Sequence, residues 1–317
     1  MSSDVAIITT GGTISSKTQN KEIYVDNNII QTILEKYSNN VKSIDIYPLM
    51  DKLSENMTPD DWFKIADKVQ EIINTNYNKI IITHGTDTMI YTATAIELFF
   101  GHLDNITIIC TGSMNNIDSP NSDVKISIES SLKAILQLNE GVFVNIRSPQ
   151  SNEKMFLNQA TNVKPIHHNS EGIKQINEKI GIYKNNKWDI QNTYSQLYSL
   201  PYKNNLQTHR KIKYLNVYPD LKIDNPDKYE LIILNSYHSL TVPTINKKDT
   251  ILNVLKNTKT NIILTGYSNT TELYSTTLHL IKNGLHVIKS MQPHVAYVYF
   301  YIGLAQNKNI DNLIKNT

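Results

Sequence analysis

The chain has 317 residues, of which 40% are hydrophobic, and its formal net charge is +2. A chain of this length and composition can bury a substantial core, which predicts a folded globular protein with one large domain or two smaller ones. The even spread of charge argues against a nucleic-acid partner, and the lack of an apolar run of roughly 18 to 20 residues argues against a membrane span.

Targeting, disulfide and metal signals are also missing from the sequence. Residues 1–4 lead straight into a predicted strand at 5–9, without the apolar segment of a signal peptide, which predicts a cytoplasmic protein. Cys110 is the one cysteine, so no intrachain disulfide can form, and its apolar neighbours favour a packing role. No cysteine and histidine cluster has the spacing of a zinc site, and we predict neither a metal nor a cofactor.

The first predicted strand ends in the turn Thr10-Gly11-Gly12-Thr13-Ile14, where hydroxyls and glycines come together. A polar stretch at 15–24 follows and is too long for a tight connection, so it has the character of a lid beside a site. Next come a helical pattern at 27–37 and a strand at 41–49. Thr58 as N-cap and Pro59 at the first helical position then predict a helix whose apolar face belongs to the core.

A second turn of the same kind follows the apolar strand at 79–82. It reads His84-Gly85-Thr86-Asp87-Thr88 and leads into a helix at 91–98. Thr and Asp at this place would suit an ordinary helix cap, but a hydroxyl beside a carboxylate at a strand end is also suited to binding or attacking a polar group. Gly85 permits close approach of the backbone to a ligand.

The remaining pattern predicts two α/β domains. A strand at 106–110 ends in Thr111-Gly112-Ser113, and helical residues at 132–138 precede a strand at 141–146, so the alternation predicts a mostly parallel sheet with right-handed crossovers. We therefore expect a larger N-terminal domain at 1–185, a polar linker at 186–211 and a smaller α/β domain at 212–317. The second domain has predicted strands at 212–219, 231–234 and 262–264 and helices at 245–255, 272–281 and 293–304.

The two glycine turns, in this order and each after a predicted strand, resemble the signatures of the L-asparaginase family, closest to its cytoplasmic type I branch. Further matches are Ser54 and Glu55 before the run Asn56-Met57-Thr58-Pro59, and the Thr111-Gly112-Ser113 turn. The chain departs from the family pattern at Val124-Lys125, where a glycine is usual.

The resemblance implies a set of site residues. Thr13 with Tyr24 would form one catalytic group, and Thr86, Asp87 and Lys164 a second, with Lys154 as the rival lysine. Substrate-binding residues would be Ser54, Glu55, Thr86, Asp87 and Ser113, and Thr241 in the second domain is a candidate to reach a partner subunit's site. Homodimers or homotetramers are implied as well.

The activity implied is hydrolysis of L-asparagine to L-aspartate and ammonia without metal or cofactor. Amide hydrolysis needs a nucleophile, a base and donors for the developing oxyanion, and which threonine attacks stays open. A glutaminase-type or other small-amide hydrolase and a non-catalytic amino-acid-binding protein are the alternatives. A tRNA-linked amidotransferase is less favoured, since no basic surface is evident.

Overall fold

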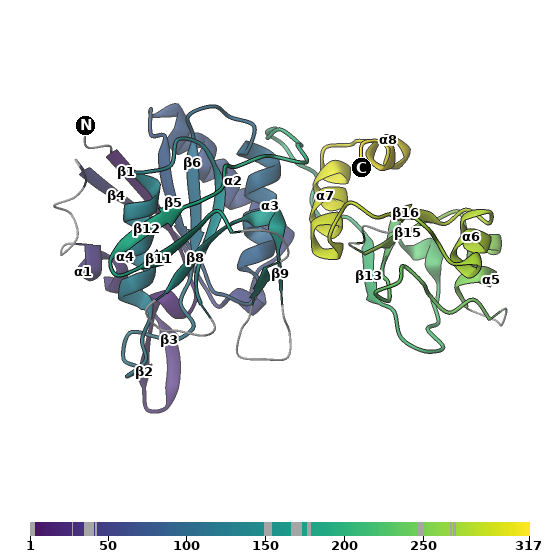
Figure 1. Cartoon of the computed structure of the whole chain (residues 1–317), viewed down its shortest axis with the longest axis horizontal. Coiled ribbons are helices and arrows are strands. Elements are labelled where there is room, and N and C mark those ends of the chain that lie inside the picture. The colour runs from purple at the N-terminus through teal and green to yellow at the C-terminus, as the bar shows by residue number, and fades with distance from the viewer. Residues whose placement is uncertain are drawn as a thin grey trace. The chain divides into compact units, whose positions relative to one another are not determined.

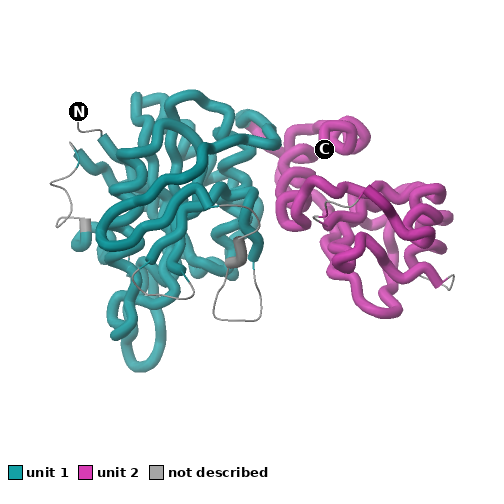
Figure 2. The backbone as a smooth tube through the Cα atoms, in the orientation of Figure 1, with its two compact units in different colours: residues 1–204 teal, residues 205–317 magenta. Residues whose placement is uncertain are grey.

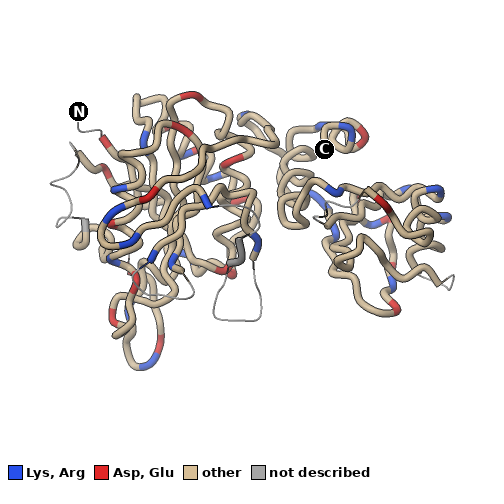
Figure 3. The backbone as a smooth tube through the Cα atoms, in the orientation of Figure 1, with Lys and Arg blue, Asp and Glu red and all other residues tan. Residues whose placement is uncertain are grey.

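The computed structural model describes residues 4–26, 28–34, 41, 43–148, 154–165, 173–175, 179–245, 250–266, 268 and 271–317. The chain divides into two compact units, Met1–Asn204 and Asn205–Thr317 (Figure 2). Figure 3 shows basic and acidic residues interspersed along both units. The prediction of a larger and a smaller α/β unit is confirmed.

An eight-stranded sheet forms the centre of the first unit (Figure 1). Its order is β12-β11-β8-β7-β6-β5-β1-β4, and the strands β4, β1, β5, β6 and β7 run parallel while β8, β11 and β12 are antiparallel additions. The bounds are β1 Asp4–Gly11, β4 Ser43–Lys52, β5 Lys79–Thr83, β6 Thr107–Thr111, β7 Gly141–Arg147, β8 Met155–Gln159, β11 Gly181–Lys184 and β12 Lys187–Ile190.

Two small antiparallel pairs lie outside this sheet. One is the hairpin of β2 Ser16–Gln19 and β3 Glu22–Val25, and the other pairs β9 Val163–Pro165 with β10 Ile173–Gln175. Short 3-10 turns precede or follow several strands: η1 Thr13–Ser15, η3 Ser54–Asn56 and η4 Ala160–Asn162.

Helices cover both faces of the sheet, which explains why the central strands are apolar along their whole length. On one face α1 Asn28–Leu34 and α4 Val124–Ile135 share a hydrophobic cluster with Ile7, Ile81 and Phe143. On the other face α2 Pro59–Asn74 packs against α3 Met89–Phe100, where the rings of Phe63 and Phe99 meet edge to face. The predicted helix start at Thr58 and Pro59 is confirmed, with a capping box.

One crossover departs from the expected right-handed pattern. The chain steps from β5 to β6 to β7 in a single direction across the sheet, yet α3 and α4, which make these two connections, lie on opposite faces. Two such connections have opposite hands. The connections through α1, α2 and α3 share one hand, so the β6–α4–β7 connection is the exception and is left-handed, against the strong general preference.

The second unit is a smaller parallel sheet. Its strands β13 Ile212–Asn216, β14 Leu231–Asn235, β15 Asn261–Thr265 and β16 His286–Ile288 stand in chain order. Its helices are α5 Ile251–Asn257, α6 Ser275–Ile281, α7 Pro293–Ala305 and α8 Ile310–Lys315, and η5 Pro226–Lys228 links the first two strands. The helix predicted at 293–304 begins where it was expected, whereas those predicted at 245–255 and 272–281 begin later, at Ile251 and Ser275. Residues 246–249 and 269–270 lie outside the described residues.

The boundary between the units lies later in the chain than the sequence predicts. The expected linker at 186–211 contains β12, and the indole nitrogen of Trp188 donates to the Ser130 carbonyl at 2.8 Å. Farther along, the backbone of Leu200 donates to Leu98, and the Tyr194 side chain packs against Gly101 and Gly141. These contacts attach the segment to the first unit as far as Asn204.

Candidate active site

Three polar turns meet at the carboxyl edge of the parallel strands. β1, β5 and β6 are neighbours in register, with Thr9 opposite Thr83 and Thr83 opposite Thr111, so the segments that follow these residues leave the sheet side by side. The chain moves from β1 to β4 on one side and then returns across β1 to β5 on the other. Ligands of open α/β sheets bind outside the carboxyl ends of the strands at such a reversal.

Glycines bring the turns into backbone contact. A Cβ on Gly12, whose φ is 76°, would lie 2.3 Å from Gly85 Cα, and a Cβ on Gly85 would lie 2.5 Å from Ser54 Oγ. A Cβ on Gly112 would lie 2.6 Å from the His84 carbonyl oxygen. The three positions therefore require glycine. Thr13 directly follows Gly12 and Thr86 directly follows Gly85, so each threonine is next to the contact between these two glycines.

Hydrogen bonds fix the same edge. Thr10 Oγ1 donates to the Thr83 carbonyl at 2.8 Å, and the His84 backbone donates to Thr111 at 2.9 Å. The Gly12 backbone donates to the Lys52 carbonyl at 2.8 Å, which joins the first turn to the end of β4. These bonds position the turns independently of the side chains that would contact a substrate.

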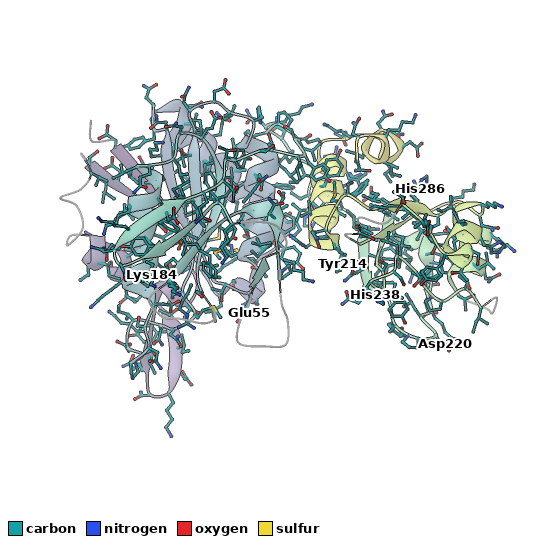
Figure 4. All side chains as sticks on the ribbon, in the orientation of Figure 1. Glu55, Lys184, Tyr214, Asp220, His238 and His286 are labelled. Carbon is teal, nitrogen blue, oxygen red and sulfur yellow. The ribbon has the colours of Figure 1, made fainter. Side chains whose placement is uncertain are left out.

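The side chains predicted for the substrate differ in exposure. Thr13 and Thr86 are half-buried, and Asp87 and Glu55 are exposed. Glu55 lies at the edge of the first unit from which the β2–β3 hairpin projects (Figure 4). Threonine hydroxyls backed by packed turns, with a carboxylate open to solvent beside them, can bind a small polar molecule at this edge.

Ser54 and Ser113 are buried more deeply. Ser54 is 3% exposed, and its carbonyl accepts a hydrogen bond from Thr88 Oγ1 at 2.7 Å, which ties η3 to the start of α3. Ser113 is fully buried, and its hydroxyl meets no partner within the described part of the chain. A buried hydroxyl without a partner is costly, so Ser113 has hydrogen-bonding capacity available at this edge.

His84 is held as a neutral structural group. Burial lowers its pKa to about 4, while the Gly85 carbonyl, 2.8 Å from Nδ1, opposes the shift. Its Nε2 lies 2.9 Å from Thr92 Oγ1 in α3. With both ring nitrogens engaged and no exposure, His84 supports the Gly85 turn from beneath.

The lysine and tyrosine predicted for the site are less firmly placed. Lys164 is exposed on β9, and no hydrogen bond joins it to Thr86 or Asp87 among the described residues. Tyr24 is 42% exposed, stands opposite Lys17 in the β2–β3 hairpin, and makes no described hydrogen bond to Thr13. Lys154 is half-buried beside the residues 149–153 that lie outside the description. The catalytic roles of these residues stay predictions.

Thr241 belongs to the second unit, where its Oγ1 lies 2.9 Å from Ser239 Oγ. Leu240 next to it has a φ of 56°, so the loop turns sharply there. The proposed reach of Thr241 toward a partner subunit therefore remains a prediction.

One contact of the candidate lid had no signal in the sequence. The Thr18 backbone donates to Asp118 Oδ2 at 2.8 Å, and Asn116 Nδ2 donates to Thr18 Oγ1 at 2.7 Å. The β2–β3 hairpin is thereby attached to the loop that follows the Ser113 turn. Polar residues a hundred positions apart carry no pattern that announces such a pairing.

Two absences among the described residues concern metal ions and membrane spans. No group of three or more histidine, cysteine, aspartate or glutamate side chains there could hold a metal ion. Within the same residues, no helix has both the length and the apolar character to cross a membrane.

Comparison with known proteins places this edge in a family context. Residues 4–194 match the family model described as "Asparaginase, N-terminal". The structure resembles the thermostable L-asparaginase from Thermococcus kodakarensis, with a TM-score of 0.81, 19% identity and coverage of 99% of this chain and 96% of the other. It also resembles a "probable cytoplasmic L-asparaginase" from Campylobacter jejuni, with a TM-score of 0.78, 18% identity and coverage of 99% and 98%.

Curated sequence relatives point to a second protein type. A glutamyl-tRNA(Gln) amidotransferase subunit from Methanococcus maripaludis is 26% identical over 181 residues, which is 55% of this chain and 42% of the relative. The corresponding amidotransferase subunit from Saccharolobus islandicus is 30% identical over 184 residues, covering 56% and 41%. The chain thus matches about two fifths of the length of these curated relatives.

Proposed function

Because residues 4–194 make this chain a member of the asparaginase family, we propose that it converts L-asparagine and water to L-aspartate and ammonia. The contact between the Gly12 and Gly85 turns supports this proposal most, because it brings two threonine-bearing turns to one edge of the sheet. Thr13 or Thr86 would attack the side-chain carboxamide, and expulsion of ammonia would leave an acyl ester that water hydrolyses.

Backbone donors at the two turns suit the developing oxyanion. The N–H groups of Gly12 and His84 are already engaged by the carbonyls of Lys52 and Thr111. The N–H groups of Thr13 and Thr86 make no hydrogen bond among the described residues. Preorganised donors of this kind stabilise charge as it forms, because they need no reorganisation during the reaction.

The substrate's charged ends would be recognised by the remaining residues. Asp87 and Glu55, both exposed carboxylates, would face the α-ammonium group, while Ser54 and Ser113 supply hydroxyls for the carboxylate. Lys164 would serve as the base or stabilise the charge of Asp87.

Ammonia release from asparagine by the purified protein is the direct test. Thr13→Ala and Thr86→Val should each lower kcat by about a thousandfold or more, because each removes a hydroxyl from the proposed nucleophile system. Thr32→Val in α1 is the matched control, since the exposed Thr32 hydroxyl bonds within its own helix. Turnover near the wild-type rate in both site variants would reject this site.

A second candidate is an amide hydrolase that supplies ammonia to a larger assembly, which the similarity to the amidotransferase subunits favours. Comparing kcat/KM for asparagine and glutamine separates the two, with asparagine preferred under the first proposal. Thermal stabilisation by asparagine without ammonia release would instead favour an amino-acid-binding protein. Sedimentation analysis tests the proposed homodimer or homotetramer.

A further inference from the structure

Glu97 is a buried carboxylate that none of the proposed catalytic steps uses. It lies in the last turn of α3, the helix that begins directly after the Thr86-Asp87-Thr88 turn, and it is fully inaccessible to solvent. Acidic side chains are seldom buried completely unless they are paired. No lysine, arginine or histidine among the described residues forms an ion pair with it, so its retention needs another explanation.

The Glu97 carboxylate binds the turn between β8 and β9 with both oxygens. Oε1 accepts hydrogen bonds from Gln159 Nε2 at 2.7 Å and from Thr161 Oγ1 at 3.1 Å, and Oε2 accepts from the Thr161 backbone at 2.8 Å. Gln159 Nε2 also donates to the Ser195 carbonyl at 2.7 Å. The carboxylate is therefore the point where α3, the 159–161 turn and the 194–196 segment are joined.

Lys164 stands a short distance along the chain from this attachment. η4 runs from Ala160 to Asn162, and β9, which carries Lys164, follows at once and also packs against α3. The helix thus holds the Thr86 and Asp87 turn at its start and the support of the Lys164 strand near its end. Lys164 pairs with Lys174 of β10, and its exposed side chain makes no hydrogen bond with another described residue.

We propose that Glu97 is a positioning residue, which holds the 159–161 turn against α3 so that Lys164 keeps a fixed place relative to Thr86 and Asp87. The inference rests on the proposed function, because it assumes that Lys164 takes part in amide hydrolysis. Glu97 contacts neither substrate nor reacting atoms and acts through the backbone between Thr161 and Lys164.

A carboxylate suits this place because every partner can donate to it. Burial raises the pKa of Glu97 to about 7, while the bonds from Gln159 and Thr161 oppose the rise. Ionised Glu97 makes charge-assisted bonds, which are stronger than those of the neutral acid. The attachment therefore tightens as pH rises through 7.

The titratable groups around Glu97 are few and keep one state over the same range. Burial raises the pKa of the Tyr194 phenol, which also interacts with Glu97, and raises the pKa of the Cys110 thiol on β6 to about 12. At the other end of α3, burial holds the pKa of His84 at about 4. Glu140, directly before β7, also acts electrostatically on the Tyr194 phenol, whereas Arg147 at the other end of β7 lies near Asp123.

Glu97→Gln tests the proposal, with Glu129→Gln as the matched control because Glu129 is a partly exposed partner of Lys133 on α4. In Glu97→Gln the NH₂ group of the new amide would face the N–H of Thr161 or of Gln159, both of which are donors. One hydrogen bond is then lost and the turn loosens. We expect kcat to fall about tenfold with KM within about twofold, since a small misplacement costs rate more than binding. The wild-type kcat should rise with an apparent pKa near 7, and this limb should disappear in Glu97→Gln but remain in Glu129→Gln.

A double-mutant cycle separates positioning from general stability. If Glu97 acts through Lys164, Glu97→Gln should have little further effect on the residual rate of Lys164→Ala. An equal loss of rate in both backgrounds would overturn the proposal, as would an unchanged kcat and an unchanged pH limb in folded Glu97→Gln.

Two measurements do not depend on activity and so distinguish failure of this inference from failure of the proposed function. The Thr161 amide should exchange its hydrogen at least about tenfold faster in Glu97→Gln than in wild type, because its acceptor is weakened. Acetylation of Lys164 by acetic anhydride, followed by mass spectrometry, should change in rate in Glu97→Gln and not in Glu129→Gln. Unchanged exchange and labelling overturn the positioning role even if the protein releases no ammonia.

Discussion

The two glycine turns are tightly constrained by neighbouring backbone, whereas the short strand β9, which carries Lys164, is much less constrained. Gly12, Gly85 and Gly112 are in close contact with neighbouring segments, and the Gly12 N–H donates to the Lys52 carbonyl at the end of β4. Lys164 lies on a three-residue strand, and its exposed side chain makes no hydrogen bond with another described residue. The comparison teaches that backbone geometry fixes the framework of the candidate site, while the proposed role of Lys164 depends on a support elsewhere in the chain.

The largest effect should follow from filling the contact between the two turns. Gly12→Ala places a Cβ 2.3 Å from the Gly85 backbone and requires a φ of 76° in a residue with a side chain. We expect loss of activity and a fall of roughly 3 kcal/mol or more in the free energy of unfolding, because overpacking and backbone strain add. Urea unfolding and ammonia release measure both.

Gly284 provides the control for that substitution. Its φ is 98°, but nothing lies within 4 Å of an added Cβ, so Gly284→Ala carries the backbone strain without the clash. We expect a loss of about 1 kcal/mol and full activity. Equal losses of unfolding free energy in the two variants would show that the clash with the Gly85 turn adds nothing to the effect of Gly12→Ala.

The second-largest effect should follow from removing the lysine side chain proposed for the site. Lys164→Met should lower kcat by about a hundredfold with an unchanged free energy of unfolding, because an exposed side chain that matters for chemistry contributes little to folding. Lys154→Met should leave kcat within about twofold. Steady-state kinetics decide between the two lysines, and the reverse result would move the site lysine to Lys154.

A smaller effect is expected at the support beneath the first turn. Burial alone would raise the pKa of Asp61, but hydrogen bonds from Lys52 Nζ at 2.7 Å and from Thr58 outweigh it and lower the pKa below its ordinary value. Asp61→Asn should cost about 2 kcal/mol at pH 7, since it weakens the capping box and the Lys52 pair.

The pH dependence of that variant follows from the direction of the shift. A lowered pKa contributes stability that is present above the unfolded value of 3.8 and is lost as pH falls below it through the folded value. Unfolding free energies of wild type and Asp61→Asn should therefore converge as pH falls below 3.8. A constant difference over this range would contradict the assignment.

The smallest effect should come from the lid contact. Asp118→Asn weakens the acceptor for the Thr18 backbone at an exposed position, which costs at most about 1 kcal/mol. We expect KM for asparagine to rise about two- to fivefold with little change in kcat, because the hairpin would spend more time away from the Asn116 loop. An unchanged KM would mean that the hairpin does not cover the substrate.

Local sequence patterns predicted most of the fold of this chain. The apolar run at 79–82 and the turn after it gave a buried strand and a helix start, and Thr58 with Pro59 gave the beginning of α2. The glycines of both turns were visible because close backbone approach permits no other residue. The family assignment followed from these positions and agrees with the match over residues 4–194.

Long-range features could not be predicted in the same way. The boundary at Asn204 depends on Tyr194 and Trp188 packing onto the sheet unit, which no local composition shows. The contact of Thr18 with Asp118 and the Glu97 attachment to Thr161 join residues that are distant in sequence. The exposed face of a helix is easy to assign, but the partner of a buried carboxylate requires coordinates.

The left-handed crossover has a consequence for how much the chain can change. Because α4 lies on the face opposite α3, the segment between Thr111 and Val124 is carried to the side where α1 follows the hairpin, and Asn116 and Asp118 reach Thr18 there. Shortening this segment would favour a return over the near face, which would leave the hairpin without a neighbour. Deletions between β6 and α4 should therefore detach the hairpin from its loop.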